Sequence, residues 1–209
     1  MNKCKVISFG ALLVLGMVLG SVLASKVSTT NSPMVIEWLE SPREVQSFTL
    51  QSSLGAFTKE SLKGQWTIVL FGYLHCTDVC PVSLVELARL ANMFSGGIVT
   101  PDFNVVFVSV DSERDSVQEV TEFVKFFHPS FIGVTGVEAE LKRLSQSLGV
   151  QFSVTSDKEN YVVAHSSYFS IIGPHGKLRG RFRSGADLAQ LKLSLMSKML
   201  VGNGEDTLR

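Results

Sequence analysis

Two cysteines, Cys76 and Cys80, are the residues whose type and spacing best suit chemistry in this chain of 209 residues. If the second thiol lies at the start of a helix, the two Cβ atoms are about 5–6 Å apart, close enough to share a metal ion or, after a small adjustment, to form a disulfide. The positive end of the helix dipole also favours the thiolate, the form that binds metals and attacks disulfides. The pair predicts a soft-metal site or a redox site, and a structural disulfide is the alternative.

The segments around the pair predict a junction between a strand and a helix. The run Trp66–Phe71 is rich in β-branched and aromatic residues, which is typical of a buried strand in a mostly parallel sheet. Pro81 suits the first turn of a helix, because its missing N–H needs no partner there and its fixed φ is already helical. Residues 82–94 are mostly apolar, with Glu86, Arg89 and Asn92 spaced three apart, which predicts a helix with one exposed stripe.

The first 25 residues are expected to carry the chain out of the cytoplasm. Lys3 and Lys5 precede a run from Val6 to Ala24 that contains no charged residue. That length can span a bilayer or serve as a signal-peptide core, and the small residues before Ser25 resemble a cleavage site. The lysines favour a cytoplasmic N-terminus. The segment therefore predicts a single-pass inner-membrane anchor with the domain facing the periplasm, or an exported domain after cleavage.

The remaining chain predicts one folded domain with polar ends. Residues 26–44 are mixed and polar with two prolines, which is typical of a tether, and residues 45–200 have the length of one domain. Residues 201–209 form a short polar tail that is expected to lack regular structure. The 19 basic and 19 acidic residues balance, and no basic cluster follows the export segment, so a nucleic-acid partner is disfavoured.

The order of helix and strand patterns indicates an α/β, thioredoxin-like three-layer sandwich with an N-terminal β-hairpin extension. Strands separated by helices need right-handed crossovers and a sheet that is covered on both faces. Asp115 with Gln118 is a plausible capping pair for one helix, and Ser184 is a plausible cap for the last. The expected strands are 47–50, 56–58, 66–71, 104–110, 167–172 and 177–182, and the expected helices are 82–94, 115–127, 137–148 and 185–200.

His165 is a candidate third ligand, because it lies immediately before the strand expected at 167–172. In a thioredoxin-like fold, the loop that enters this strand lies beside the cysteine turn. Two thiolates and one imidazole suit Cu(I), and imidazole also suits Cu(II). The alternative is a histidine that only hydrogen-bonds within its loop. The other histidines, His75, His128 and His175, are expected at turns or a helix end and not as ligands.

Four motifs resemble those of the SCO/SenC family, copper-delivering assembly factors for cytochrome c oxidase. The stretch Phe71–Pro81 resembles the cysteine signature of that family, and Val108–Asp115 is similar to its second motif. Val163–Ser167 resembles the segment that carries the ligand histidine, and the turn Gly173–Gly176 also matches. The resemblance covers nearly all of residues 48–200, so it applies to the whole predicted domain.

Two positions depart from the pattern of that family. Thr77 stands where a proline is expected inside the thiol turn, and Ala164 stands where an aspartate commonly precedes the histidine. Neither change removes a ligand, but both are expected to alter metal affinity or redox poise. The resemblance also implies that Asp78 and Asp111 help to orient the site, and capping of a helix or strand is the alternative for both.

The resemblance implies a copper-binding chaperone in which Cys76, Cys80 and His165 hold a copper ion and pass it to the copper-A subunit of the oxidase. The thiols must be reduced to bind, so an upstream thiol reductant is expected as well. The alternative is an extracytoplasmic thiol–disulfide oxidoreductase that acts through Cys76 and Cys80. Thioredoxin-type reductases usually have a cis-proline before the strand that faces their cysteines, and Val163–Ser167 has His165 and no proline. We therefore expect a metal carrier rather than an enzyme.

Overall fold

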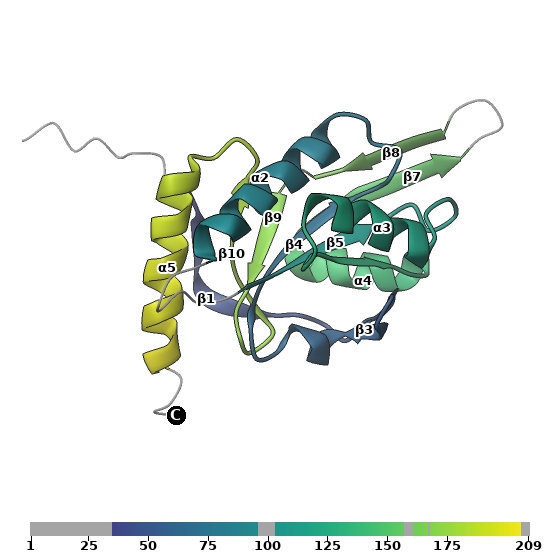
Figure 1. The fold of residues 1–209 in the computed structure, drawn as a ribbon. Helices are drawn as coiled ribbons and strands as arrows, with labels where there is room; N and C mark the ends of the chain where they lie inside the picture. The colour runs from purple at the N-terminus through teal and green to yellow at the C-terminus, as the bar shows by residue number, and fades with distance from the viewer. Residues whose placement is uncertain (1–34, 96–102, 157–160, 167, 206–209) are drawn as a thin grey trace, which may run out of the picture. The chain divides into compact units, whose positions relative to one another are not determined.

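The computed structural model describes residues 35–95, 103–156, 161–166 and 168–205, with the backbone alone at positions 156, 165 and 201–205. These residues belong to one compact unit that begins at Val35, and Figure 1 shows its helices packed around a central sheet. In chain order the elements are β1 (Glu37–Glu44), β2 (Thr49–Ser52), β3 (Gly55–Thr58), the short 3₁₀ helix η1 (Lys59–Leu62), β4 (Trp66–Gly72), α2 (Val79–Phe94), β5 (Phe103–Ser109), α3 (Val117–Phe127), β6 (Ile132–Thr135), α4 (Glu138–Leu148), β7 (Phe152–Ser156), β8 (Tyr161–His165), β9 (Tyr168–Ile172), β10 (Lys177–Arg183) and α5 (Leu188–Glu205).

The main sheet has eight strands in the order β1-β10-β9-β4-β5-β6-β2-β3. Its centre is parallel, because β4, β5 and β6 run in the same direction. On its other side β4 pairs antiparallel with β9. Every residue of β4 is buried, as expected for an apolar strand that is covered on both faces. The hairpin β2–β3 continues the sheet at β6, which confirms the predicted hairpin extension.

Helices cover both faces of this sheet and form two hydrophobic cores. On one face, strand residues such as Ile68 and Phe107 pack with residues of α2, α3 and α5. On the other face, Val69 and Val108 pack with residues of α4 and of the β2–β3 hairpin. Successive residues of one strand point to opposite faces, so each central strand contributes to both cores. These three layers confirm the predicted α/β, thioredoxin-like sandwich.

Four strands lie where the sequence analysis expected none. β1 occupies much of the segment assigned to a tether (26–44), and it pairs antiparallel with β10 at the edge of the sheet. That assignment is wrong from Glu37 onward, because the polar side chains and Pro42 suit an exposed edge strand as well as they suit a linker. The other three are the four-residue β6 and the strands β7 and β8, which form a separate two-stranded sheet.

The predicted helix caps are wrong at two positions. α3 is capped by Ser116, whose side chain accepts a hydrogen bond from the Glu119 N–H while Glu119 reaches back to Ser116. Asp115, predicted as that cap, is buried and binds other groups. At α5, Asp187 accepts from the Gln190 N–H, whereas Ser184 donates to Glu86. α5 also continues to Glu205, so the first part of the predicted tail is helical.

The predicted anchor or signal segment, residues 1–25, lies outside the described residues, as does the last part of the tail, residues 206–209. Within the described ranges, no helix is both long and apolar enough to cross a membrane.

Candidate metal and thiol site

Cys76 lies in the turn between β4 and α2, and Cys80 lies in the first turn of α2. The Cys76 N–H donates to the Tyr73 carbonyl at 3.3 Å, which closes the turn. One turn further on, the Cys80 N–H donates to the Cys76 Sγ at 3.4 Å, so the first sulfur receives the positive end of the α2 dipole. Both cysteines are present as thiols. The predicted junction of strand, thiol turn and helix start is confirmed.

The two thiols have different surroundings. Cys80 is 1% exposed and belongs to the core cluster that includes Leu84 and Phe107, whereas Cys76 is only partly buried at the edge of that cluster. Gly72 leaves room for the buried sulfur, because a Cβ at this position would lie 2.8 Å from the Cys80 Sγ and 2.6 Å from Phe107 Cε2. One sulfur is therefore fixed by the core and the other is accessible.

The surroundings move the acidities of the two thiols in opposite directions. Burial alone raises the pKa of Cys76, but hydrogen bonds from the backbone N–H and the thiol of Cys80 and from the N–H groups of Asp78 and Val79 outweigh it and lower the pKa overall. Burial, which outweighs a hydrogen bond from the backbone of Tyr73, raises the pKa of Cys80 to about 12. Cys76 is therefore the more acidic thiol of the pair, and the Cys80 thiol donates a hydrogen bond to its sulfur.

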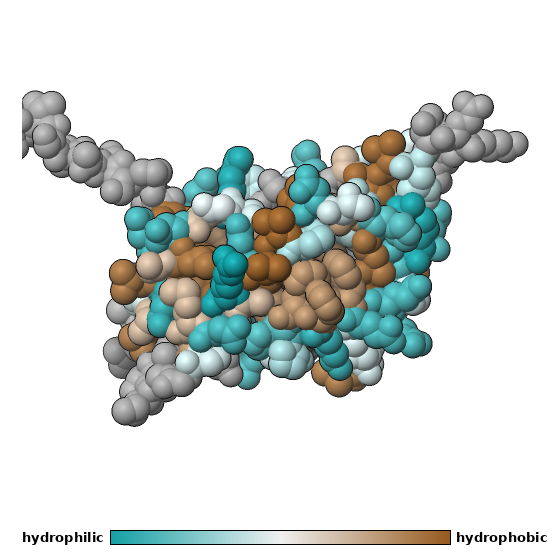
Figure 2. All heavy atoms as spheres, turned by 45° about the horizontal axis from the view of Figure 1, so that its top comes forward, coloured by the Kyte–Doolittle hydropathy of each residue, from teal (hydrophilic) through white to brown (hydrophobic). Residues whose placement is uncertain are grey.

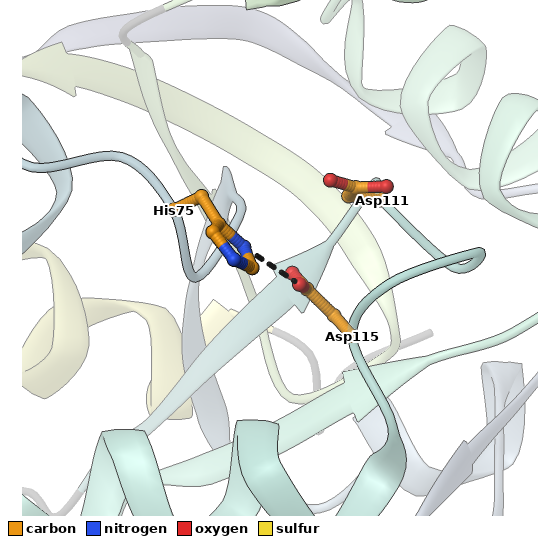
Figure 3. A group of neighbouring side chains, drawn as sticks. All are labelled: His75, Asp111 and Asp115. Atoms are coloured by element: carbon orange, nitrogen blue, oxygen red, sulfur yellow. Dashed lines mark ion pairs between the residues drawn. The ribbon is translucent and has the colours of Figure 1, made fainter. Parts of the chain in front are cut away.

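The loop between β5 and α3 fastens the cysteine turn through Asp115. One carboxylate oxygen of Asp115 accepts from the Leu74 N–H at 2.9 Å and from the Ser109 hydroxyl at 2.5 Å. The other oxygen is buried and has no hydrogen-bond partner among the described residues, and His75 Nδ1 lies 3.8 Å from it (Figure 3). The sequence analysis missed Asp115 as a site residue, because its two partners lie on β5 and on the cysteine turn.

Asp111 and Asp78, which were predicted to help orient the site, make different contacts from each other. Asp111 is buried in the same loop, and it binds the Arg114 guanidinium at 2.5 Å and the Tyr161 hydroxyl of β8. Asp78 occupies the N-cap position of α2 without a side-chain capping bond, and its backbone N–H bonds to the Cys76 sulfur. Although potential ligand atoms of His75, Asp111 and Asp115 lie within 4.8 Å of one another, the carboxylate of Asp111 is already occupied by Arg114 and Tyr161.

His165, the predicted third ligand, ends β8, where its backbone pairs with that of Phe152. Only the backbone of His165 is among the described parts of the structure, so its role as a ligand stays a prediction. His128 follows α3, and its ring bonds to Ser130. His175 lies in the turn between β9 and β10, and its backbone pairs with that of Lys63.

These features define a class of protein: a thioredoxin-like domain with a reduced Cys-x-x-x-Cys pair where the first central strand meets its helix. The model of the SCO1/SenC family matches residues 38–199, and the chain belongs to that family.

Similar proteins come from bacteria and from mitochondria. The chain is 35% identical to a "Putative copper-binding protein" of Stutzerimonas stutzeri, over 69% of this chain and 68% of the relative. It is 42% identical to the mitochondrial SCO1 homolog 1 of Arabidopsis thaliana, over 56% of this chain and 35% of that protein. It is 29% identical to the mitochondrial SCO1 homolog of Homo sapiens, over 68% and 48%. The chain thus covers about half or less of these mitochondrial relatives.

Two similar solved structures contain copper. The crystal structure of Arabidopsis thaliana ScoI with copper bound has a TM-score of 0.68 at 34% identity, and the match covers 75% of this chain and 98% of that one. The crystal structure of yeast Sco1 with copper bound has a TM-score of 0.67 at 28% identity, over 75% and 88%. The match to the family model spans the cysteine turn, α2 and the strands around them.

Proposed function

We propose that this chain is a copper-binding chaperone that is tethered to a membrane and delivers copper to the copper-A centre during the assembly of cytochrome c oxidase. The observation that carries the proposal is the pair of thiols at the start of α2, one of them with a lowered pKa, in a chain whose relatives bind copper. Thiolates are soft ligands and select Cu(I) over harder metals.

The donor set fits copper as cargo. Cys76 is the more readily deprotonated of the two thiols, and Cys80, whose pKa is raised to about 12, must lose its proton to become a ligand. Copper binding therefore releases a proton, and the affinity should rise with pH. The thiols must also be reduced, which implies an upstream thiol reductant.

His165 is the proposed third ligand, and the pattern of β8 supports it. Tyr161 and Val163 are partly buried whereas Val162 and Ala164 are exposed, so alternate positions of this strand face the body of the protein. Val163 packs against the second core cluster. Residue 165 comes two positions after Val163 in the same strand, so it belongs to the set of alternate positions that face the body of the protein.

Delivery needs a surface that a partner can contact beside the thiols. Val79 and Val82, at the start of α2, are 46% and 51% exposed. On the face shown in Figure 2, hydrophobic side chains gather among polar ones. Exposed apolar side chains next to a metal site are suited to brief contact with a partner protein, which here is the copper-A subunit.

The uncharged run from Val6 to Ala24 and the lysines before it support the location that we propose, with the domain on the outer side of the inner membrane. Protease treatment of intact spheroplasts should digest the domain. N-terminal sequencing of the mature protein should start at Met1 for an anchor and near Ser25 or Lys26 after cleavage.

The test of copper binding is the stoichiometry of the reduced full-length chain and its His165→Ala variant. We expect about one copper per chain, with retention lost in the variant. His128→Ala is the control, because the His128 ring bonds to Ser130 on another part of the chain, and this variant should retain copper. Equal copper retention in the His165→Ala variant would remove His165 from the ligand set.

The second candidate function is thiol–disulfide exchange, which the opposite pKa shifts of the two thiols favour. The Cys76 thiolate would attack a disulfide of a partner and release one partner thiolate. Cys80, after losing its proton, would attack Cys76 in the mixed disulfide and release the second thiol. The partner gains two electrons and the pair becomes a disulfide. A chain that reduces a model disulfide but holds no copper would support this function over copper delivery.

A further inference from the structure

The strand that carries His165 belongs to a hairpin outside the main sheet. Among the strands that the structure describes, β7 and β8 pair only with each other, in a two-stranded sheet, whereas the other eight form one sheet. A two-stranded hairpin is marginally stable by itself in water. Phe152 and Val163 pack against the second core cluster, and a directional contact would fix the position of the hairpin further.

The structure contains such a contact at the start of β8. The Tyr161 hydroxyl donates to the buried carboxylate of Asp111. The Arg114 guanidinium lies 3.6 Å from the centre of the Tyr161 ring and binds the other oxygen of Asp111 at 2.5 Å. A hydrogen bond to a buried carboxylate and a cation over the ring together hold this one side chain on two sides.

The loop that receives Tyr161 also holds the cysteine turn. The loop of residues 110–116 is joined to β4, because the Val110 N–H donates to the Gly72 carbonyl at 2.9 Å. Within the loop, the Asp115 N–H donates to the Asp111 carbonyl at 2.9 Å. Asp115 in turn accepts from Leu74, two residues before the first thiol. Two carboxylates, four residues apart, thus fasten two segments that are far apart in the sequence.

We propose that Tyr161 is a positioning residue for the copper site. Held by Asp111 and Arg114, it fixes the β7–β8 hairpin against the loop 110–116 and thereby sets the position of His165 relative to Cys76 and Cys80. This inference rests on the proposed function as far as copper is concerned. The attachment of the hairpin does not depend on copper.

The chain offers a matched pair of variants. Tyr161→Phe removes the hydroxyl that binds Asp111 and keeps the ring under Arg114. Tyr168→Phe is the control, because Tyr168 also binds an arginine through its hydroxyl and lies near the guanidinium groups of Arg181 and Arg183, but it belongs to β9 of the main sheet.

The first measurement is amide hydrogen exchange of β7 and β8 in the reduced full-length chain without copper. A hydrogen bond to a charged group contributes enough that its loss should accelerate exchange in these strands roughly tenfold or more. The Tyr168→Phe variant should exchange in β7 and β8 like the unaltered chain. Unchanged exchange in the Tyr161→Phe variant would overturn the proposal, whatever the behaviour of copper.

The second measurement is the Cu(I) affinity of the same chains together with X-ray absorption at the copper edge. In the Tyr161→Phe variant we expect affinity to fall roughly tenfold, with a weaker histidine signature and both sulfur ligands retained. Faster exchange with unchanged affinity and spectrum would overturn the positioning role. If the unaltered chain holds no copper, the proposed function fails, while the exchange result still decides whether Tyr161 holds the hairpin.

Discussion

The two cysteines are four residues apart, but they differ in burial and in acidity. Cys80 is enclosed by the core and keeps its proton, whereas Cys76 is partly exposed and receives hydrogen bonds from the first turn of α2. Any reaction that begins with a thiolate therefore begins at Cys76.

Selective alkylation tests this difference. Because the pKa of Cys76 is lowered from its usual 9.0, its reaction with iodoacetamide should reach half of the maximal rate below pH 9.0. Cys80 should remain largely unmodified until its thiol ionises near pH 12 or the domain unfolds. Tandem mass spectrometry locates the label, and equal labelling of both thiols at neutral pH would contradict the assignment.

Gly72 is the residue on which the position of the buried sulfur depends. Gly72→Ala places a methyl group within 3 Å of the Cys80 Sγ and of the Phe107 ring, so we expect the free energy of unfolding to fall by about 1–3 kcal/mol. Cys80 should also become more reactive towards alkylation. The control is Gly136→Ala, where the added Cβ would lie 2.9 Å from Cδ2 of the buried Leu50, so stability should fall as well while Cys80 stays unreactive. Urea denaturation of both variants gives the comparison.

At the scale of single residues, the sequence was sufficient to predict the two thiols. It was insufficient to predict the residues that hold the cysteine turn and the β7–β8 hairpin in place. Spacing and Pro81 predicted the thiol turn, because a turn followed by a helix is a local property of the chain. Asp115 and Tyr161 were missed as supports, because their partners lie 41 and 50 positions away in the sequence. Such pairs follow only from the way in which the strands assemble.

Among the elements, the long apolar segments were predicted well and the short or polar ones were not. β4, α2 and the hairpin β9–β10 lie close to their expected bounds, because each is buried and has a clear apolar pattern. β7 and β8 alternate partly buried and exposed residues, so a signal was present, but it spans only five residues in each strand. β1 is almost entirely exposed and gives no apolar signal.

β1 nevertheless joins the fold through Trp38. Its ring contacts Trp66 in a T-shaped pair with 6.3 Å between centroids, and its Nε1–H donates to Ser194 of α5 at 3.2 Å. Trp38→Ala should therefore lower the free energy of unfolding by about 2 kcal/mol, somewhat less than for a fully buried aromatic residue. Leu39→Ala, next along the strand and 36% exposed, should change it by about 0.5 kcal/mol or less. Equal effects in thermal or urea unfolding would contradict the role of Trp38.

For the whole molecule, copper and folding should be coupled, since the proposed ligands come from two separate parts of the fold. A ligand that binds only the folded state, at a free concentration 100-fold above its Kd, stabilises that state by about 2.7 kcal/mol. Reduced protein with Cu(I) should therefore unfold at higher denaturant than without it, and a chelator should reverse the shift. Chain with an oxidised Cys76–Cys80 pair should show no copper-dependent shift, and a shift of the same size in it would contradict thiol ligation.

The burial of Cys80 also has a consequence for how sequences of this domain can diverge. Surface sites usually tolerate changes in the hydrophobic interior, because loops absorb small displacements. Here the Cys80 sulfur belongs to the same core cluster as Leu84 and Phe107, so the packing of the hydrophobic interior determines its position. A substitution that merely reshapes that interior alters the reactive centre as directly as one in the cysteine turn. Relatives with different activities should therefore differ in their interior residues as well as in the visible motif.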